Sequence, residues 1–452
     1  MEKLTLAVAA AACILVFCLP PAWWLAVYVA TLAWYPSYLT VKVGTLDFSA
    51  ARIVILAIYA SLFFRQHLLN RFRFNYLDAL AITYFAGQLL AGAITSDFRT
   101  LLENRSGAAF DTLLPYFAVR AIITDKQRCL SFLKASVYIV APMAIFGLYE
   151  SWTGHNLFSF LEEYRAWGVT TELSPRHGFY RAMFTASHPI MFGLFFAMLG
   201  PIWAGLVYQI KNARFLCYAG ITLAAIGVFS SMSSGPAAAA LVAIAFIAFY
   251  RYRKYWKPVV VAIILMCATI EVISNRHFYY YPTRFMFSVA TAWYRGKLMD
   301  VALFEGGMSG HWLIGYGLRT DESLKASAEW AAKIDNRPGV DTVNEYLLVL
   351  FRFGLIGLVP FLAMLYATIK KLKEAWKISL SDADKWLIWC LSASIVGLLA
   401  AFFTASLHAG QPTILFFILI GLCGVMPLIT ADENNRLLTK ANSGVWPVKR
   451  NE

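Results

Sequence analysis

Long apolar runs constrain this chain of 452 residues more than any other feature. Segments such as 4–19, 189–207, 258–273 and 347–369 carry almost no charge, and a bilayer is spanned by about 20 apolar residues. The chain is 60% hydrophobic and 14% charged, whereas soluble proteins average about 45–50% and about 25%. The sequence therefore predicts an all-α polytopic integral membrane protein. It excludes disorder, a coiled coil and a disulfide-stapled secreted domain.

Thirteen windows of the sequence are apolar enough to be interpreted as membrane spans. The first two are short and meet at Pro20-Pro21, so they could instead form a hairpin or one broken helix. We therefore expect about 12–13 transmembrane helices. The windows lie near residues 4–19, 22–36, 48–64, 77–95, 107–123, 130–149, 188–209, 215–229, 236–250, 258–273, 346–369, 386–404 and 412–430.

The basic residues predict how the chain is oriented in the membrane. More than half of the 39 lysines and arginines lie in short loops that alternate with the other loops along the chain. The positive-inside rule assigns these loops to the cytoplasm. The net charge of +13 is therefore interpreted as orientation and attraction to anionic lipid, and not as nucleic-acid binding.

The opposite, outer side then receives two long loops, and long loops in a compact protein are usually functional. The second contains two helical patterns, at 293–305 and 320–334, which predict a small helical outer domain. The expected divisions are N-terminal transmembrane helices at 1–149, a first outer loop at 150–187, central transmembrane helices at 188–273, a large outer helical loop at 274–345, C-terminal transmembrane helices at 346–430 and a cytoplasmic tail at 431–452.

Three outer stretches combine polar residues with glycines or a proline beside a predicted span. Each stretch alone has a simple structural explanation, namely a helix cap, a proline in the first helical turn or close packing of small residues. A serine-rich run at 230–236 is interpreted as a turn with small-residue packing. The residues concerned are Arg176, Arg181, His188 and Pro189 in the first stretch, Arg295, Gly315 and Gly317 in the second, and Asp341, Asn344, Glu345, Leu347, Gly354 and Gly357 in the third.

Taken together, these stretches resemble the O-antigen ligase and polymerase superfamily of membrane glycosyltransferases, which includes Wzy-type polymerases. The C-terminal motif of that family is His-Asn-x-x-Leu followed by Gly-x-x-Gly. Asn344, Leu347, Gly354 and Gly357 stand at the matching positions, and Val343 stands where the family has histidine.

Two further elements of the family match in the same order along most of the chain. Arg181 with His188-Pro189 resembles the outer arginine that precedes a helix-opening proline, and Arg295 with Gly315 and Gly317 resembles the arginine and Gly-x-Gly turn before the C-terminal motif. The resemblance implies transfer of a glycan from a polyprenyl diphosphate carrier at the outer, periplasmic face of the bacterial inner membrane. It also implies partners such as a flippase or a chain-length regulator.

Arginine is the residue that suits such a donor, because it stays charged and can bind phosphate through a planar fork. The same side chain can neutralise the diphosphate as it leaves. The candidate diphosphate-binding residues are Arg181, Arg295, Arg284, Arg319 and Arg176.

The acceptor hydroxyl also needs a base. Glu345 is the first candidate by position, although a carboxylate in a first helical turn is commonly only a favourable dipole contact. Asp341, His188 and His177 are the other candidates. No metal or other cofactor is expected, because Asp382-Ala-Asp384 falls on the cytoplasmic side, where Ser381 is expected to cap a helix, and the outer histidines show no metal-binding spacing.

The leading functional prediction is a polysaccharide polymerase that joins undecaprenyl-diphosphate-linked repeat units into an exopolysaccharide, capsule or O-antigen. A ligase that transfers finished glycan to lipid A-core or to protein is the alternative. It ranks second because Val343 replaces the histidine of the family motif. A transporter or flippase is the second alternative. Carriers often place ionisable groups mid-span and show repeated halves, whereas the polar residues here concentrate in two outer loops.

Overall fold

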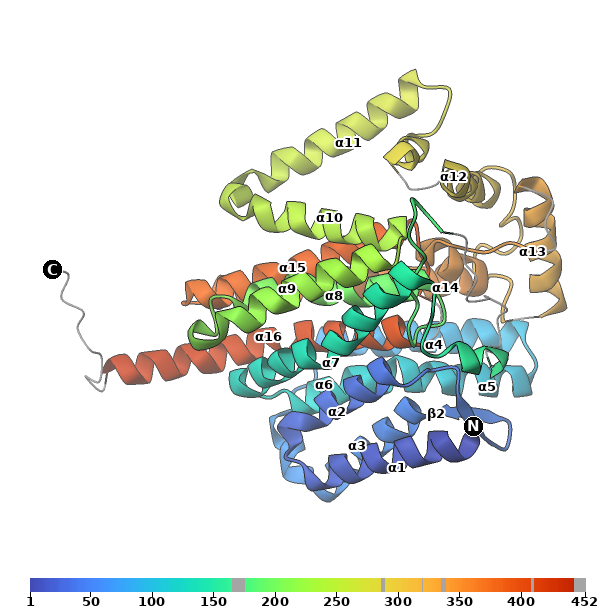
Figure 1. Ribbon diagram of the computed structural model, residues 1–452. Coiled ribbons are helices and arrows are strands. Elements are labelled where there is room, and N and C mark those ends of the chain that lie inside the picture. The colour runs from blue at the N-terminus through green and yellow to red at the C-terminus, as the bar shows by residue number, and fades with distance from the viewer. Residues whose placement is uncertain (165–174, 286–288, 319, 335–338, 408–409, 443–452) are drawn as a thin grey trace.

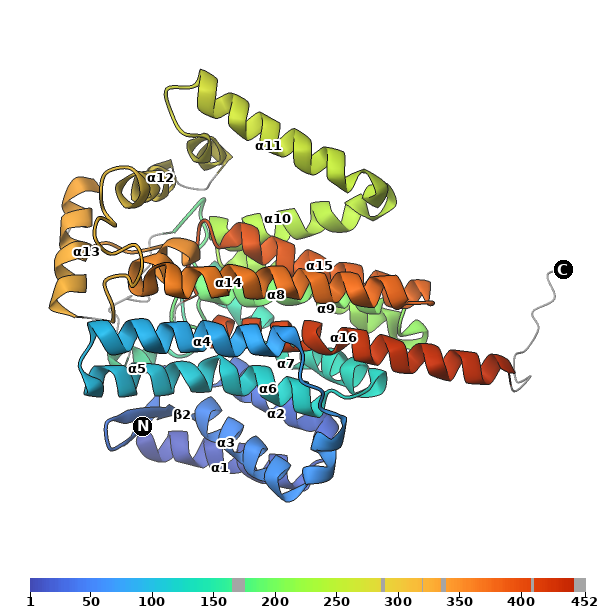
Figure 2. The ribbon, with the colours of Figure 1, turned by 180° about the vertical axis from the view of Figure 1, so that it is seen from behind.

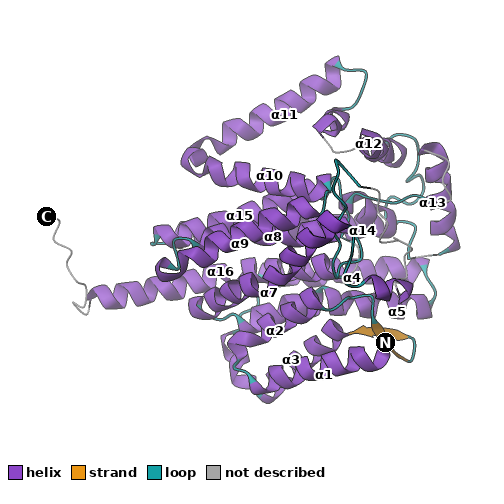
Figure 3. Ribbon diagram, in the orientation of Figure 1, coloured by secondary structure: helices purple, strands orange, loops and turns teal. Residues whose placement is uncertain are grey.

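The computed structural model describes residues 1–164, 175–285, 289–318, 320–334, 339–407 and 410–442. Most of these residues form helices that lie side by side (Figures 1 and 2). The exception is a small antiparallel hairpin of β1 (Thr40–Val43) and β2 (Leu46–Ser49), drawn in orange in Figure 3. The sequence analysis did not foresee this hairpin, which joins two apolar helices.

The helices of the bundle coincide with the apolar windows of the sequence. The window 107–123 is the exception, because it falls on two helices, α5 and α6, that meet at Thr112. The bundle helices are α1 (Glu2–Cys18), α2 (Pro21–Trp34), α3 (Ala50–Phe64), α4 (Tyr76–Thr95), α5 (Phe98–Asp111), α6 (Leu113–Ile122), α7 (Lys126–Thr153), α8 (Pro189–Leu206), α9 (Arg214–Ser230), α10 (Ser234–Ala248), α14 (Glu345–Ile378), α15 (Asp382–Ala401) and α16 (Gln411–Asn442). The apolar helix α11 (Trp256–Ile273) extends away from the bundle and has no buried residue (Figure 1).

Within the described residues, seven helical segments are long and apolar enough to cross a membrane. One of them, Ser234–Ile273, joins α10 and α11 through the 3-10 helix η4 (Phe249–Tyr255). Three shorter apolar helices are Pro21–Trp34, Ala50–Phe64 and Arg214–Ser230. The all-α membrane class is therefore confirmed. The other long segments are Tyr76–Thr95, Lys126–Thr153, Pro189–Leu206, Glu345–Ile378, Asp382–Ala401 and Gln411–Thr439.

The first two helices form a hairpin, one of the two possibilities left open by Pro20-Pro21. The hydroxyl of Thr5, near the start of α1, lies 2.8 Å from that of Tyr35, at the end of α2. Such a contact requires the two helices to run antiparallel.

Four charged residues near span ends form two ion pairs inside the bundle. Arg120 of α6 binds both carboxylate oxygens of Asp78, at 2.8 and 2.9 Å, and Tyr116 donates to the same carboxylate at 2.6 Å. Arg52 binds Asp111 in the same two-pronged way, at 3.0 and 2.6 Å. A buried charge is tolerated when it is paired and hydrogen-bonded in this manner. These four residues therefore hold helices together.

Two further helices, α12 (Val289–Leu303) and the amphipathic α13 (Asp321–Ile334), pack at one end of the bundle (Figure 1). They correspond to the predicted helices 293–305 and 320–334. Their small apolar core includes Leu298, Val301 and Trp330, and it continues onto Phe351 of α14. The two helices are thus attached to the bundle through α14.

The attachment depends on a break in α14 at Gly354, where φ is 57° and ψ is −157°. The break leaves backbone groups without helical partners, and the segment 312–317 binds them. Tyr316 and Gly317 donate to the carbonyls of Phe351 and Arg352 at 2.7 and 3.1 Å. In return, Leu355 and Ile356 donate to the carbonyls of Trp312 and Leu313 at 2.8 and 3.1 Å. We call this contact between 312–317 and 351–356 the glycine joint.

Glycine is required at the joint for reasons of space and conformation. A Cβ on Gly354 would lie 2.4 Å from the carbonyl of Leu313, and one on Gly315 would lie 2.7 Å from the carbonyl oxygen of Phe351. Both residues also have positive φ, which side chains of L-amino acids rarely adopt. A Cβ on Gly317 would meet Thr95 of α4 at 2.4 Å, and one on Gly357 would meet Phe353. Gly315 and Gly354 therefore allow the close backbone approach at the joint, whereas Gly317 and Gly357 lie against side chains.

Gly315→Ala is expected to destabilise the protein more than Gly310→Ala. Both glycines have nearly the same φ, 79° and 77°. An alanine in this left-handed conformation lowers the free energy of unfolding by about 1–2 kcal/mol in either variant. Only Gly315 has backbone atoms within contact distance, since nothing lies within 4 Å of a Cβ on Gly310. Melting temperatures of the detergent-purified variants measure the difference. Equal losses of melting temperature in the two variants would contradict the role of Gly315 in the glycine joint.

Candidate functional site

Two of the predicted phosphate-binding arginines lie in the loop that precedes α8. Arg176 donates to the carbonyl of Met232 at 3.0 Å, and Arg181 donates to the hydroxyl of Ser233 at 3.0 Å. The amide of Ala182 donates to the carbonyl of Ser230 at 2.9 Å. The loop is therefore held against the turn between α9 and α10.

This turn is the serine-rich run 230–236 of the sequence. Its interpretation as a turn is confirmed, and Met232 has a positive φ of 43° there. Its contact with the two arginines was missed. The run contains no charge, so its composition indicated only close packing.

Arg295 joins these two arginines from α12. It is 8% exposed. Burial, followed by the charge of Arg176, lowers its pKa to about 10, while Asp341 acts in the opposite direction. Burial, followed by the charges of Arg176 and Arg295, lowers the pKa of Arg181 to about 10. Three arginines from the two long loops that the sequence predicts on the outer side therefore lie within electrostatic range of one another. We call Arg176, Arg181 and Arg295 the outer arginine group.

The outer arginine group combines positive charge with burial. Both pKa values remain well above neutral pH, so the side chains stay charged. Among the described residues no carboxylate forms an ion pair with Arg181, and its Nε has no hydrogen-bond partner. A bound phosphate or diphosphate would stabilise neighbouring guanidinium groups of this kind, because it would neutralise their charge and accept the hydrogen bond that the Arg181 Nε–H does not make.

Asp341 is the predicted base that the structure brings next to this group. It is exposed, and it interacts electrostatically with Arg295. The hydroxyl of Tyr294, the residue before Arg295, accepts from the Asp341 amide at 2.9 Å and donates to the Asp341 carbonyl at 3.1 Å. Tyr294 therefore ties the start of the C-terminal motif to α12, a role that the sequence analysis did not foresee.

Glu345 and Asn344 have a different environment. The Glu345 carboxylate accepts from the amide of Leu407 at 2.6 Å, and its charge interacts with Arg352. Asn344 caps α14 by accepting from the amide of Leu347 at 3.1 Å, and it donates to the carbonyl of Phe403 at 3.4 Å. Both side chains connect the start of α14 to the segment after α15.

The remaining predicted site residues are distributed as follows. His188 caps α8, because its Nδ1 accepts from the amide of Ile190 at 3.1 Å. His177 has a positive φ of 51° in the loop that carries Arg176. The side chain of Arg284 and the whole of Arg319 lie outside the described residues.

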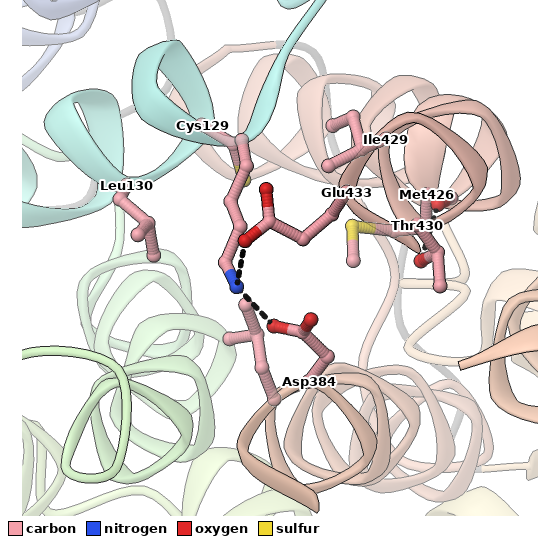
Figure 4. Close-up of a pocket in the computed structure, with 9 residues that line it drawn as sticks. Cys129, Leu130, Asp384, Met426, Ile429, Thr430 and Glu433 are labelled. Carbon is pink, nitrogen blue, oxygen red and sulfur yellow. Dashed lines mark hydrogen bonds and ion pairs between the residues drawn. The ribbon is translucent and has the colours of Figure 1, made fainter. Parts of the chain in front are cut away.

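The Asp-x-Asp sequence on the basic side is engaged in structural contacts. Asp384 forms an ion pair with Lys126 at 2.7 Å and accepts from Gln209 at 2.6 Å. Figure 4 shows the carboxylates of Asp384 and Glu433 paired with one nitrogen between them, the ammonium of Lys126. The cavity beside them has about 10 Å³, which is room for one water. Ser381 is the N-cap residue of α15, as expected, but its side chain forms no cap hydrogen bond.

The described residues contain no group of three or more His, Cys, Asp or Glu side chains that could hold a metal ion. The expectation of a metal-independent site stays a prediction.

The sequence matches no family model and no curated protein. Function has to be inferred from the residues and their arrangement.

Inorganic diphosphate is expected to raise the melting temperature of the purified protein, because an anion that binds only the folded state stabilises it by about 2.7 kcal/mol at 100 times its Kd. Arg181→Ala should lose most of this shift. Arg99→Ala is the matched control, because Arg99 is exposed and pairs only locally with Glu103. An undiminished shift in Arg181→Ala would exclude Arg181 from the anion site.

Proposed function

We propose that the protein is a membrane glycosyltransferase that polymerises polyprenyl-diphosphate-linked oligosaccharide repeat units into a polysaccharide. The observation that carries this proposal is the outer arginine group beside Asp341. Arg295, which is buried, and Arg176 and Arg181, which are partly buried, supply positive charge for a lipid diphosphate. Asp341 supplies a carboxylate at the exposed edge of the same group.

The reaction follows from these charges. The acceptor hydroxyl oxygen attacks the anomeric carbon of the donor sugar, and the bond from that carbon to the phosphate oxygen breaks. The hydroxyl proton passes to Asp341, and polyprenyl diphosphate leaves with the bonding electron pair. Preorganised arginines stabilise the negative charge that develops on the leaving group. A positioned base of this kind typically contributes about 10²- to 10⁴-fold to the rate.

A bacterial inner-membrane location with the active side facing the periplasm accords with the arrangement of the bundle. The N-terminus lies at the same end as α12 and α13, while the end of α16 extends from the opposite end, with the basic turn between α10 and α11 (Figures 1 and 2). An odd number of passes gives this arrangement. We propose thirteen passes, with α5 and α6 together forming one, and an N-terminus outside.

The alternatives make different use of the same site. In a ligase, the diphosphate donor would be held in the same way, and the acceptor would be lipid A-core or protein. The departure at Val343 from the family's histidine favours the polymerase. A transporter is less well supported, since the charges Arg52, Asp78, Asp111 and Arg120 are engaged in ion pairs.

Arg181→Ala and Arg295→Ala are each expected to abolish polymer formation while expression and folding persist. Charge-assisted hydrogen bonds contribute about 1.5–3 kcal/mol each, and the loss acts on both donor binding and departure. The assay uses purified protein in lipid with an undecaprenyl diphosphate repeat unit, with and without EDTA. Arg99→Ala is the control.

Each possible product has a defined meaning. A ladder of longer oligomers in the wild type supports the polymerase, a single transfer to lipid A-core supports the ligase, and translocation without a covalent product supports transport. Normal ladders from both arginine variants would exclude the proposed role of the outer arginine group.

Asp341→Asn is expected to lower kcat by about 10²- to 10⁴-fold with a smaller change in KM, because the base acts in the transition state. Glu345→Gln should lower kcat far less, since its carboxylate oxygen is occupied by the Leu407 amide and an amide oxygen can accept the same hydrogen bond. The opposite order of effects would make Glu345 the base.

A further inference from the structure

A second group of polar residues lies where α4, α5 and α14 run side by side (Figure 2), and it includes Arg105 of α5 and Arg352 of α14. Arg105 of α5 is 8% exposed. Its Nη1 donates to Oε1 of Gln88 on α4 at 2.5 Å. Its guanidinium carbon lies 5.0 Å from the centre of the Phe353 ring on α14. Neither partner carries a negative charge.

Arg352 of α14 lies within electrostatic range of the Arg105 side chain, and its charge also acts on Glu345. The Nε of Arg105 is buried without a hydrogen-bond partner. Ionisable residues at membrane depth are costly, and they often mark a functional site.

The paired charges elsewhere in the bundle provide a direct comparison. Arg120 and Arg52 each bind a carboxylate through two hydrogen bonds, as a purely structural arginine does. Arg105 instead meets a neutral amide and an aromatic ring. This environment holds the guanidinium in place and leaves its charge for an anion.

The second group is connected to the outer arginine group through the segment 341–352. Asp341, at the start of the segment, interacts with Arg295, and Arg352, at its end, interacts with Arg105. The glycine joint lies nearby, since a Cβ on Gly317 would contact Thr95 at the end of α4. A ligand in each group would therefore be held by one continuous part of the fold.

We propose that Arg105, with Arg352 and Gln88, forms a second anion site, which binds the diphosphate of the lipid-linked acceptor. The inference rests on the proposed function. A polymerase needs two lipid diphosphates in each cycle, one on the donor and one on the acceptor, whereas a ligase needs one. No bond changes at this site, because the acceptor reacts through a sugar hydroxyl and keeps its diphosphate.

The first experiment measures binding alone and does not depend on catalysis. Wild-type protein in nanodiscs of neutral lipid is titrated with radiolabelled polyprenyl diphosphate that carries no sugar. Two equivalents are expected to bind. Arg105→Met should lower the affinity for one of them about 10- to 100-fold, because one charge-assisted hydrogen bond is lost. Arg181→Ala should lower the affinity for the other. Inorganic diphosphate in a parallel titration tests whether the headgroup alone is sufficient.

Gln88→Glu provides a second variant in case Arg105→Met does not fold. It keeps the size of the side chain and places a carboxylate against Arg105, so the charge is neutralised without a cavity. The Gln88→Glu variant should bind one equivalent of lipid diphosphate fewer than the wild type. The control Arg99→Ala should bind both. One equivalent in the wild type, or two in both Arg105→Met and Gln88→Glu, would overturn the second site.

The second experiment compares two acceptors with the same sugar sequence, one linked to polyprenyl diphosphate and one present as a simple methyl glycoside. The wild type is expected to prefer the lipid-linked acceptor in kcat/KM. Arg105→Met and Gln88→Glu should reduce this preference about 10- to 100-fold. An unchanged preference in both variants would overturn the second site even if polymer forms. Two binding sites without any glycan transfer would instead reject the proposed function and leave the anion site standing.

Discussion

The end of the molecule that carries α12 and α13 depends on the glycine joint, the backbone contact between 312–317 and the break in α14. A helix that breaks inside a membrane protein exposes carbonyl and amide groups that must be satisfied. Four backbone hydrogen bonds from 312–317 satisfy them. The same contact fixes α12 and α13 to the bundle. It thereby determines where Arg295 lies relative to the loop that carries Arg176 and Arg181.

The arginines of this fold are of two kinds, which differ in the charge of their partners. Arg120 and Arg52 bind carboxylates and join helices. Arg181 and Arg105 are held by neutral partners, Ser233 and Gln88. A neutral partner orients a guanidinium without cancelling its charge, so these arginines are suited to an incoming anion. This difference separates the proposed binding residues from the structural ones.

Much of the fold and part of the site could be predicted from the sequence. The apolar windows predicted the bundle helices, because hydrophobicity over a spanning length is a local property of the chain. The break between α5 and α6 at Thr112 was missed, since helix boundaries depend on packing as well as on local sequence. The role of Ser233 was also missed. The hydrogen-bond partner of a serine cannot be predicted when that partner, here Arg181, lies far away in the sequence.

The sequence by itself determined an all-α membrane protein and indicated the arginines and glycines that the structure brings together. Hydrophobicity, charge and the absence of a Cβ are properties of single residues, and they can be read from the chain. Only the tertiary structure decided that Asp341 lies beside Arg295 whereas Glu345 is engaged by Leu407. It also showed that Arg105 has neutral partners, whereas Arg52 and Arg120 bind carboxylates. Which charges meet depends on contacts between distant segments, and these exist only after the helices have packed.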